Sequence, residues 1–192
     1  GVFAISDALR RSFIGDFSVP EDRAFAAYAG PNLDLQAIPA RQDVGGRAPT
    51  ILFVGVQFER KGGDALLRAF ANLRTRHPQA RLIVIGPKTF SYQADGVEWW
   101  GYLRKEEPSE WKKLVEAYAD ADVFCLPTRY EPFGIAFVEA MMFGLPCVGT
   151  RTSAVPEIIQ EGTTGFLVEV DDVPALERRL EQLFNDAPLR AK

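Results

Sequence analysis

Two glutamates and the backbone between them carry the strongest chemical signal in this 192-residue sequence. Glu131 and Glu139 lie eight residues apart in the stretch EPFGIAFVE. Pro132 suits the first position of a helix, where its missing N–H has no cost, so we predict a helix over 132–143. Along such a helix the two carboxylates are separated by about 12 Å, because each residue adds about 1.5 Å.

The free backbone N–H groups at the start of this predicted helix form a candidate phosphate site. They belong to Phe133, Gly134 and Ile135, and Gly134 lets an anion approach the backbone closely. A carboxylate on each side of an anion site matches a ligand with hydroxyl groups at both ends and phosphate in the middle, as in a nucleotide sugar. The alternative is structural: Glu131 interacts only with the helix dipole, and Glu139 pairs with a nearby Arg or Lys.

A second stretch, FVGVQFERKGGD, contains positive charge and glycines after an apolar run. Gly55, Gly62 and Gly63 permit close backbone approach, and Arg60 and Lys61 bring charge to the same place. The glycine spacing matches neither a dinucleotide-binding fingerprint nor a phosphate-binding P-loop. We predict that Lys61, and less directly Arg60, faces the glutamate helix across the edge of a sheet.

The elements that must position these residues alternate along the chain from Ile51 onward. Short β-branched runs predict strands at Ile51–Val54, Arg81–Ile85, Val97–Trp100, Val123–Leu126, Cys147–Val148 and Gly165–Val168. Amphipathic runs predict helices at Gly63–Arg76, Ser109–Asp120, Pro132–Phe143, Val155–Gln160 and Val173–Phe184. The pattern predicts an α/β fold: a Rossmann-like, doubly wound parallel sheet of about six strands with helices on both faces. Such sheets bind ligands beyond the carboxyl ends of their strands.

Composition narrows the functional class. The chain is 47% hydrophobic, which suits a globular core, and its net charge of −4 argues against nucleic acid as a partner. No apolar stretch approaches the roughly 20 residues of a membrane span. Cys125 and Cys147 lie in apolar runs and are expected to be buried thiols of a reducing compartment. We expect a cytoplasmic protein, with a peripheral position at the inner membrane surface as the alternative.

At this point the sequence resembles the group 1 family of GT-B glycosyltransferases over nearly its whole length. EPFGIAFVE is similar to the E-x7-E motif of that family. The stretches EAMMFGLPCVGT and AVPEIIQEGTTGFLV follow in the family's order, the latter resembling its PE…G…G(F/L)LV segment. The resemblance is specific because several motifs occur in the right order at predicted strand ends.

The resemblance implies a division of the chain. Residues 50–192 would be the carboxy-terminal domain, which binds a nucleotide-diphosphate sugar. Residues 1–39 would end an amino-terminal domain whose bulk is absent, and residues 40–49 would be the hinge. The partners implied are the nucleotide sugar and the chain's own missing domain. The residues do not identify the sugar, the nucleobase or the acceptor, and we expect the fragment alone to be inactive.

The resemblance also implies roles for single residues. Lys61 would stabilise the leaving phosphate and Glu131 would bind the donor-sugar hydroxyls, both as catalytic residues. Glu139 would bind the ribose hydroxyls, and the amides of Phe133–Ile135 would bind the diphosphate. The segment around Leu103 would contact the base through its backbone. Transfer would retain the anomeric configuration, with no metal and no cofactor required.

One position departs from the family pattern. The family usually has an arginine after the glycine that matches Gly55, and here that position is Val56. Arg60, next to Lys61, is a candidate to supply the missing charge to the donor.

Three other functions are compatible with parts of this pattern: a glycoside hydrolase, a nucleotide-sugar epimerase and a non-catalytic binding module. Carboxylates about 12 Å apart fit neither geometry of a glycoside hydrolase. A nucleotide-sugar epimerase of the same fold stays open, because the absent half would decide it. A non-catalytic nucleotide-sugar-binding module also stays open; it would need Glu139 and the phosphate site but neither Lys61 nor Glu131.

Overall fold

A computed structural model describes residues 1–32, 38, 47–89, 93–186 and 189. Its main body is a six-stranded sheet in which each neighbouring pair of strands is parallel, with the order β5-β4-β3-β6-β7-β8. The strands are β3 (Thr50–Val54), β4 (Arg81–Ile85), β5 (Val97–Gly101), β6 (Val123–Leu126), β7 (Cys147–Thr150) and β8 (Gly165–Val168). This order confirms the predicted doubly wound sheet.

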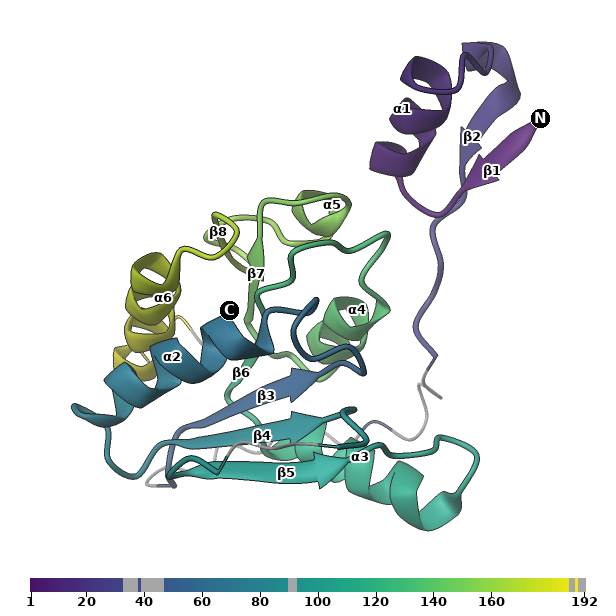
Figure 1. Cartoon of the computed structure of the whole chain (residues 1–192). Helices are drawn as coiled ribbons and strands as arrows, with labels where there is room; N and C mark the ends of the chain where they lie inside the picture. Colours follow the sequence, from purple (N-terminus) through teal and green to yellow (C-terminus); the bar gives the residue numbers. More distant parts are fainter. Residues whose placement is uncertain (33–37, 39–46, 90–92, 187–188, 190–192) are drawn as a thin grey trace.

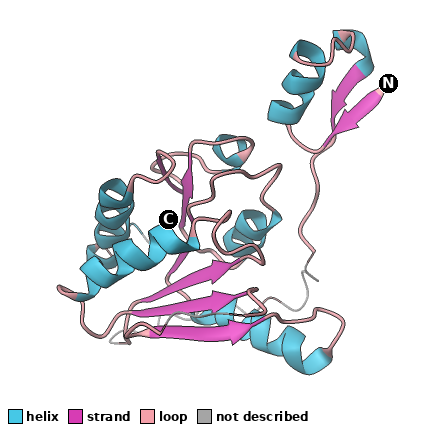
Figure 2. Cartoon of the chain, viewed as in Figure 1, coloured by secondary structure: helices cyan, strands magenta, loops and turns pink. Residues whose placement is uncertain are grey.

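Helices cover both faces of this sheet (Figure 2). They are α2 (Gly63–Arg74), α3 (Pro108–Asp120), α4 (Ile135–Met142), α5 (Val155–Ile158) and α6 (Val173–Asn185). α2 and α6 pack against each other on one face (Figure 1). α3 and α4 cover the other face, because right-handed crossovers that move in opposite directions from the centre of a sheet place their helices on opposite sides. The central strands are therefore buried on both faces, which explains their continuous apolar runs.

The strand order reverses between β3 and β6, which are hydrogen-bonded neighbours with Ile51 opposite Val123. The chain leaves β3 toward β4 and leaves β6 toward β7. The loops at 55–62 and 127–134 therefore meet at the carboxyl edge of the sheet. This edge is where open α/β sheets bind ligands.

The start of the predicted glutamate helix differs from expectation. α4 begins at Ile135, with Gly134 as its N-cap, and not at Pro132. Gly134 has a φ of +105°, and a Cβ there would lie 2.9 Å from the ring of Phe137. A left-handed residue cannot continue a right-handed helix, so Glu131 lies on an irregular loop. The separation of about 12 Å along a helix axis therefore does not apply to the two glutamates.

A smaller unit precedes the sheet. It consists of β1 (Val2–Ala4), α1 (Asp7–Gly15), the short 3₁₀ helix η1 (Glu21–Arg23) and β2 (Ala24–Ala26), with β1 and β2 paired in parallel. Ala4 and Ala24 are the only buried apolar side chains that the structure describes in this unit, whereas Phe3, Phe17 and Tyr28 are exposed. The unit therefore has almost no core of its own. Most of the predicted hinge at 40–49 lies outside the described residues.

Both cysteines are buried and free, as predicted. Burial raises the pKa of the Cys125 and Cys147 thiols well above the ordinary value, so neither is a reactive thiolate. None of the described helices has the length and apolar character required to span a bilayer.

Candidate functional site

Lys61 and Glu131 meet across the point where the strand order reverses. The Nζ atom of Lys61 donates a hydrogen bond to Oε2 of Glu131. Their side chains are only 15% and 7% exposed. Gly55 leaves room for the stem of Lys61, because a Cβ at that position would lie 3.1 Å from Cγ of the lysine. Both predicted catalytic residues therefore reach one place, and they form an ion pair that the sequence did not predict.

The two loops that carry this pair are joined by their backbones. The N–H of Arg129 donates to the carbonyl oxygen of Arg60 at 2.9 Å. The guanidinium of Arg60 donates to the carbonyl oxygen of Tyr130 at 2.5 Å and also to the side chain of Gln57. The Arg60 guanidinium is thus engaged in loop contacts, and its predicted role as a substitute for the family arginine stays a prediction. Val56 is exposed at the same edge.

Arg129, which the sequence analysis missed, anchors the loop just before Glu131. Its guanidinium donates to both carboxylate oxygens of Asp64 at 2.8 and 2.9 Å. It also donates to both oxygens of Asp171 at 2.6 and 3.1 Å. The hydrogen bonds from the Arg129 guanidinium to Asp64 lower the pKa of Asp64. No motif marked this network, because its members are 42 and 65 residues apart in the sequence.

The Asp64 contact predicts a pH-dependent contribution to stability. The pKa of Asp64 is below its ordinary value of 3.8, so the contact stabilises the fold above that pH and is lost as pH falls through the lowered pKa. We expect Asp64→Asn to cost at most about 1 kcal/mol at pH 7, because the Asp64 side chain is 37% exposed. In urea unfolding, the difference in unfolding free energy between variant and wild type should shrink as the pH is lowered from about 5 to below about 4. A difference that is constant with pH would contradict the assignment.

Glu139 lies on α4 with its side chain 3% exposed. Its Oε1 accepts a hydrogen bond from Nζ of Lys105, and its Oε2 accepts one from the hydroxyl of Tyr118 at 3.1 Å. The sequence analysis did not predict either partner. One signal was available for Tyr118, because a tyrosine on the apolar face of an amphipathic helix generally needs a hydrogen-bond partner. The structural alternative for Glu139, a pairing with a nearby lysine, is therefore present in this structure.

The predicted phosphate site lies between the two glutamates. Among the residues that the structure describes, the N–H groups of Phe133, Gly134 and Ile135 have no acceptor. They precede or open the first turn of α4, where backbone N–H groups carry partial positive charge. The ring of Tyr28 lies 6.3 Å from that of Phe133, so the chain that leads away from β2 passes beside this site.

The loop that follows β5 reaches the same edge. Leu103 packs against the apolar core, and the N–H of the next residue, Arg104, is occupied by the carboxylate of Glu110. Lys105 of this loop extends to Glu139 on α4. The predicted base-binding segment therefore lies next to the predicted ribose-binding residue, although whether it contacts a base stays a prediction.

Comparison with known proteins identifies the family. The family model described as "Glycosyl transferases group 1" matches residues 36–192. The chain belongs to this family. A D-inositol 3-phosphate glycosyltransferase from Corynebacterium aurimucosum is 33% identical over 83% of this chain and 41% of its own length. A GDP-mannose-dependent alpha-(1-6)-phosphatidylinositol monomannoside mannosyltransferase from Mycolicibacterium smegmatis is 30% identical over 87% of this chain and 51% of its own length. The chain thus spans about half the length, or less, of these relatives.

Solved structures agree on the fold of this group 1 chain. HepE from Anabaena, solved with UDP and glucose, has a TM-score of 0.80 at 21% identity, over 99% of this chain and 55% of its own. A glycosyltransferase from Rickettsia africae has a TM-score of 0.82 at 18% identity, over 100% and 55%. At these identities the likeness concerns the fold, which is that of GT-B glycosyltransferases.

In this group 1 chain the small β1–α1–β2 unit contacts the sheet domain beside the site. The N–H groups of Asp7 and Ala8, in the first turn of α1, donate to the two carboxylate oxygens of Glu157 at 2.8 and 2.6 Å. Glu157 lies on α5, which Figure 1 shows next to α1. The N–H of Ala154, just before α5, donates to the carbonyl oxygen of Glu131 at 3.3 Å. The two units are thus connected through the segment that supports Glu131.

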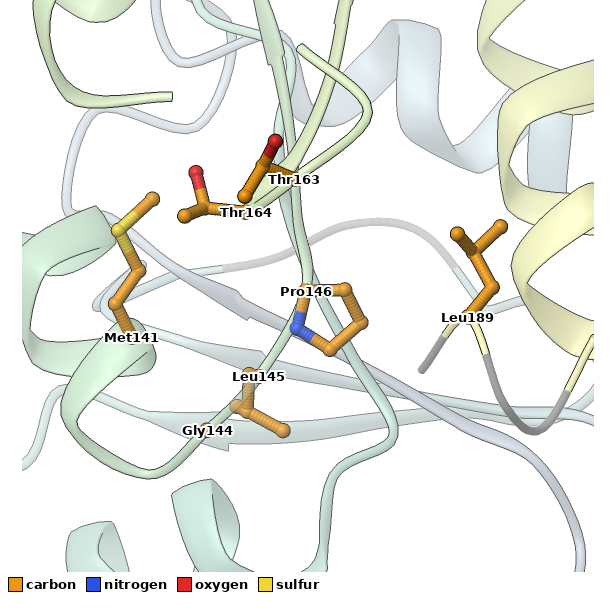
Figure 3. Close-up of a pocket in the computed structure, with 7 residues that line it drawn as sticks. All are labelled: Met141, Gly144, Leu145, Pro146, Thr163, Thr164 and Leu189. Atoms are coloured by element: carbon orange, nitrogen blue, oxygen red, sulfur yellow. The ribbon is translucent and has the colours of Figure 1, made fainter. Parts of the chain in front are cut away.

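A cavity of about 100 Å³ lies elsewhere on the domain (Figure 3). Its lining comes from the end of α4, the segment between α4 and β7, the turn before β8 and a leucine after α6: Met141, Gly144, Leu145, Pro146, Thr163, Thr164 and Leu189. The residues before β7 and β8 mark the amino ends of these strands, opposite to the predicted site. The lining has no charged side chain and does not resemble the glutamate–lysine edge.

The structure thus brings Lys61, Glu131, Glu139 and the three amides of the α4 start to one edge of the sheet. Within the described ranges, no group of three or more His, Cys, Asp or Glu side chains could hold a metal ion. The arrangement offers the cation of Lys61, two buried carboxylates and free backbone donors to a ligand with phosphate and hydroxyl groups.

Proposed function

We propose that this chain contains the donor-binding domain of a retaining glycosyltransferase, which transfers a sugar from a nucleotide-diphosphate sugar to an acceptor. The observation that carries the proposal is the convergence of Lys61, Glu131, Glu139 and the free amides at the reversal point of the strand order. Family membership supports it, because relatives of this family are named for sugar transfer.

The ligand would cross this edge with its diphosphate over the amides of Phe133–Ile135. Its ribose hydroxyls would bind Glu139, and the backbone near Leu103 would face the base. At the other end, Lys61 would bind the β-phosphate and Glu131 the hydroxyls of the sugar. The donor would therefore separate the Lys61–Glu131 ion pair, and each member would gain a contact with the substrate in place of the other.

These residues would stabilise the charges that develop during transfer. As the bond between the sugar and the β-phosphate breaks, negative charge grows on the phosphate and positive charge on the sugar ring. Once the bound donor has separated Lys61 from Glu131, Lys61 and the α4 amides would face the phosphate, so they would stabilise its growing charge with little further reorganisation. Glu131 would lie close to the position where the sugar becomes positive. The proposal requires no metal and no cofactor beyond the donor itself.

The division of labour along the chain is part of the proposal. Residues 50–192 would hold the donor, residues 1–39 would belong to the acceptor-binding domain, and residues 40–49 would form the hinge between them. The contacts of Glu157 with α1 and of Phe133 with Tyr28 support this arrangement, because they join the two units beside the site. The complete enzyme would act in the cytoplasm, and this fragment alone would not transfer sugar.

Calorimetric titration with UDP, GDP and ADP, and then with their sugar conjugates, tests the proposal. The HepE structure contains UDP and the M. smegmatis relative is named for GDP-mannose, so both bases belong in the test. We expect one diphosphate to bind with saturation, and Glu139→Ala and Lys61→Ala each to weaken binding by about 10-fold or more. Absence of saturable binding by any of the three, in the complete protein, would contradict the proposal. A binding module without catalysis would instead retain its function in the Lys61→Ala variant.

A further inference from the structure

The two carboxylate oxygens of Glu139 have partners of different kinds. Oε2 accepts from the hydroxyl of Tyr118 on α3, and Oε1 accepts from the ammonium of Lys105 in the loop before α3. A carboxylate that is 3% exposed must have both oxygens satisfied when no ligand is present. Each carboxylate oxygen can accept two hydrogen bonds, but these two partners cover a side chain that is only 3% exposed. A ribose hydroxyl would therefore reach Glu139 by taking the place of one of them.

Tyr118 is fixed in place. Its side chain is fully buried, and its ring stacks on Phe143 at 5.1 Å and on Phe124 at 6.2 Å. Burial, reinforced by the negative charge of Glu139, raises the pKa of Tyr118 well above its ordinary value. The hydroxyl therefore stays protonated and acts as a hydrogen-bond donor to the carboxylate. Movement of this ring would disrupt the packing between α3, α4 and β6.

Lys105 is bound more loosely. Its side chain is 35% exposed, and it lies on the loop between β5 and α3 rather than in a helix or strand. A long lysine stem can rotate its ammonium into water without disturbing the core. Exchange of Lys105 for a ligand hydroxyl therefore disturbs little else, whereas exchange of Tyr118 would leave a buried hydroxyl without a partner.

We propose that Tyr118 is a positioning residue that fixes Glu139 for ribose recognition, while Lys105 occupies the ribose-facing oxygen until the nucleotide replaces it. The inference rests on the proposed function, because it assumes that Glu139 binds the ribose. It adds two residues to the site with effects of opposite sign: Tyr118 favours binding and Lys105 competes with it.

The test compares each nucleotide with its 2′,3′-dideoxy form. The diphosphate that binds most tightly among UDP, GDP and ADP is titrated beside its dideoxy analogue, and the ratio of the two dissociation constants is the readout. In wild type the ribose form should bind about 10–100-fold more tightly, as expected for hydrogen bonds to a charged group. The ratio is the dissociation constant of the dideoxy form divided by that of the ribose form. Tyr118→Phe should lower this ratio about 10-fold by weakening binding of the ribose form alone, because binding of the dideoxy form does not involve Glu139.

A purely structural role of Tyr118 would give a different result. Loss of packing or of stability would weaken both nucleotide forms equally and leave the ratio unchanged. Leu180→Ala serves as the matched control, because it removes buried apolar volume on α6 and should reduce stability without altering the ratio. A wild-type ratio in a folded Tyr118→Phe protein would overturn the assignment of Tyr118.

Lys105→Met provides an independent arm, and its urea unfolding is measured beside the titrations, because the variant leaves the buried Glu139 carboxylate without its ion-pair partner. We expect the ribose form to bind about 3–10-fold more tightly, because the hydroxyl no longer competes with the ammonium, and the dideoxy form to be unaffected. Equal weakening of both forms would mean that Lys105 contacts the ligand itself, and would overturn its assignment as a competitor. Glu139→Gln separates this inference from the proposed function. If wild type and Glu139→Gln show the same ratio, Glu139 does not bind the ribose, and the proposed function is contradicted at this residue before the roles of Tyr118 and Lys105 are tested.

Discussion

Replacing Lys61 by methionine is expected to lower kcat of the complete enzyme by about 1,000-fold, or about 4 kcal/mol of transition-state stabilisation. Lys61 is the cation that the structure places against Glu131, at the edge where the sugar–phosphate bond would break. Methionine keeps a stem of similar length over Gly55 but removes the charge. A loss of this size matches the removal of one preorganised group from the charge that develops in the transition state.

Loss of stability could imitate this loss of catalysis. In Lys61→Met the carboxylate of Glu131, 7% exposed, would lack its ion-pair partner, which typically costs a few kcal/mol of unfolding free energy. The double variant Lys61→Met with Glu131→Gln removes both charges and should recover most of the stability. Its activity should stay at least as low as that of the single variant, since Glu131 is itself proposed to act on the sugar.

Steady-state kinetics and urea unfolding of the same three proteins check the prediction. The rate should be measured at saturating donor, because weaker binding of the diphosphate raises KM as well. Recovery of activity together with stability in the double variant would show that Lys61 only holds the fold. A kcat of the single variant within 10-fold of wild type would contradict the charge-stabilising role.

The sheet was predictable because its signals are local. Runs such as Ile51–Val54 and Leu82–Ile85 are continuously apolar because both faces of a central parallel strand are covered. Each predicted strand coincides with an observed strand to within two residues at either end. The order of strands then follows from short right-handed connections, which leave few ways to arrange six alternating units.

The start of α4 was not predictable by the same means. Pro132 suits the first position of a helix, and the helical pattern extends back to it. Gly134 determines where the helix begins: its φ is positive, so the helix starts after it, at Ile135. A glycine in a helical pattern is compatible with either conformation, and tertiary packing selects between them.

The partners of the predicted site residues were also beyond local reasoning. Glu139 and Tyr118 are 21 residues apart, and Lys105 is 34 residues from Glu139. Sequence spacing indicates which residues share a helix face, but it does not indicate which side chains from separate helices and loops converge. The segment around Leu103 was expected to contact the base, yet only the three-dimensional arrangement shows that Lys105 of the same loop covers Glu139.

Replacing Gly62 by alanine should destabilise the fold more than any other glycine-to-alanine substitution in the loops at 55–62 and 127–134. Gly62 has a φ of +74°, and a Cβ there would lie 1.9 Å from the carbonyl oxygen of Pro127. The loops that follow β3 and β6 are in backbone contact at this point. We expect a loss of about 4 kcal/mol or more, of which about 1–2 kcal/mol comes from the left-handed conformation and the rest from overlap with the rigid backbone.

Gly162→Ala is the matched control for this prediction. Gly162 has a φ of +75°, but a Cβ there would meet nothing within 4 Å. It should therefore lose only the conformational part, about 1–2 kcal/mol in urea unfolding. Equal losses in the two variants would show that the loops separate freely and that their contact is not rigid. If the contact is rigid, Gly62→Ala should also displace Lys61 from Glu131, so nucleotide affinity should fall in this variant and be unchanged in Gly162→Ala.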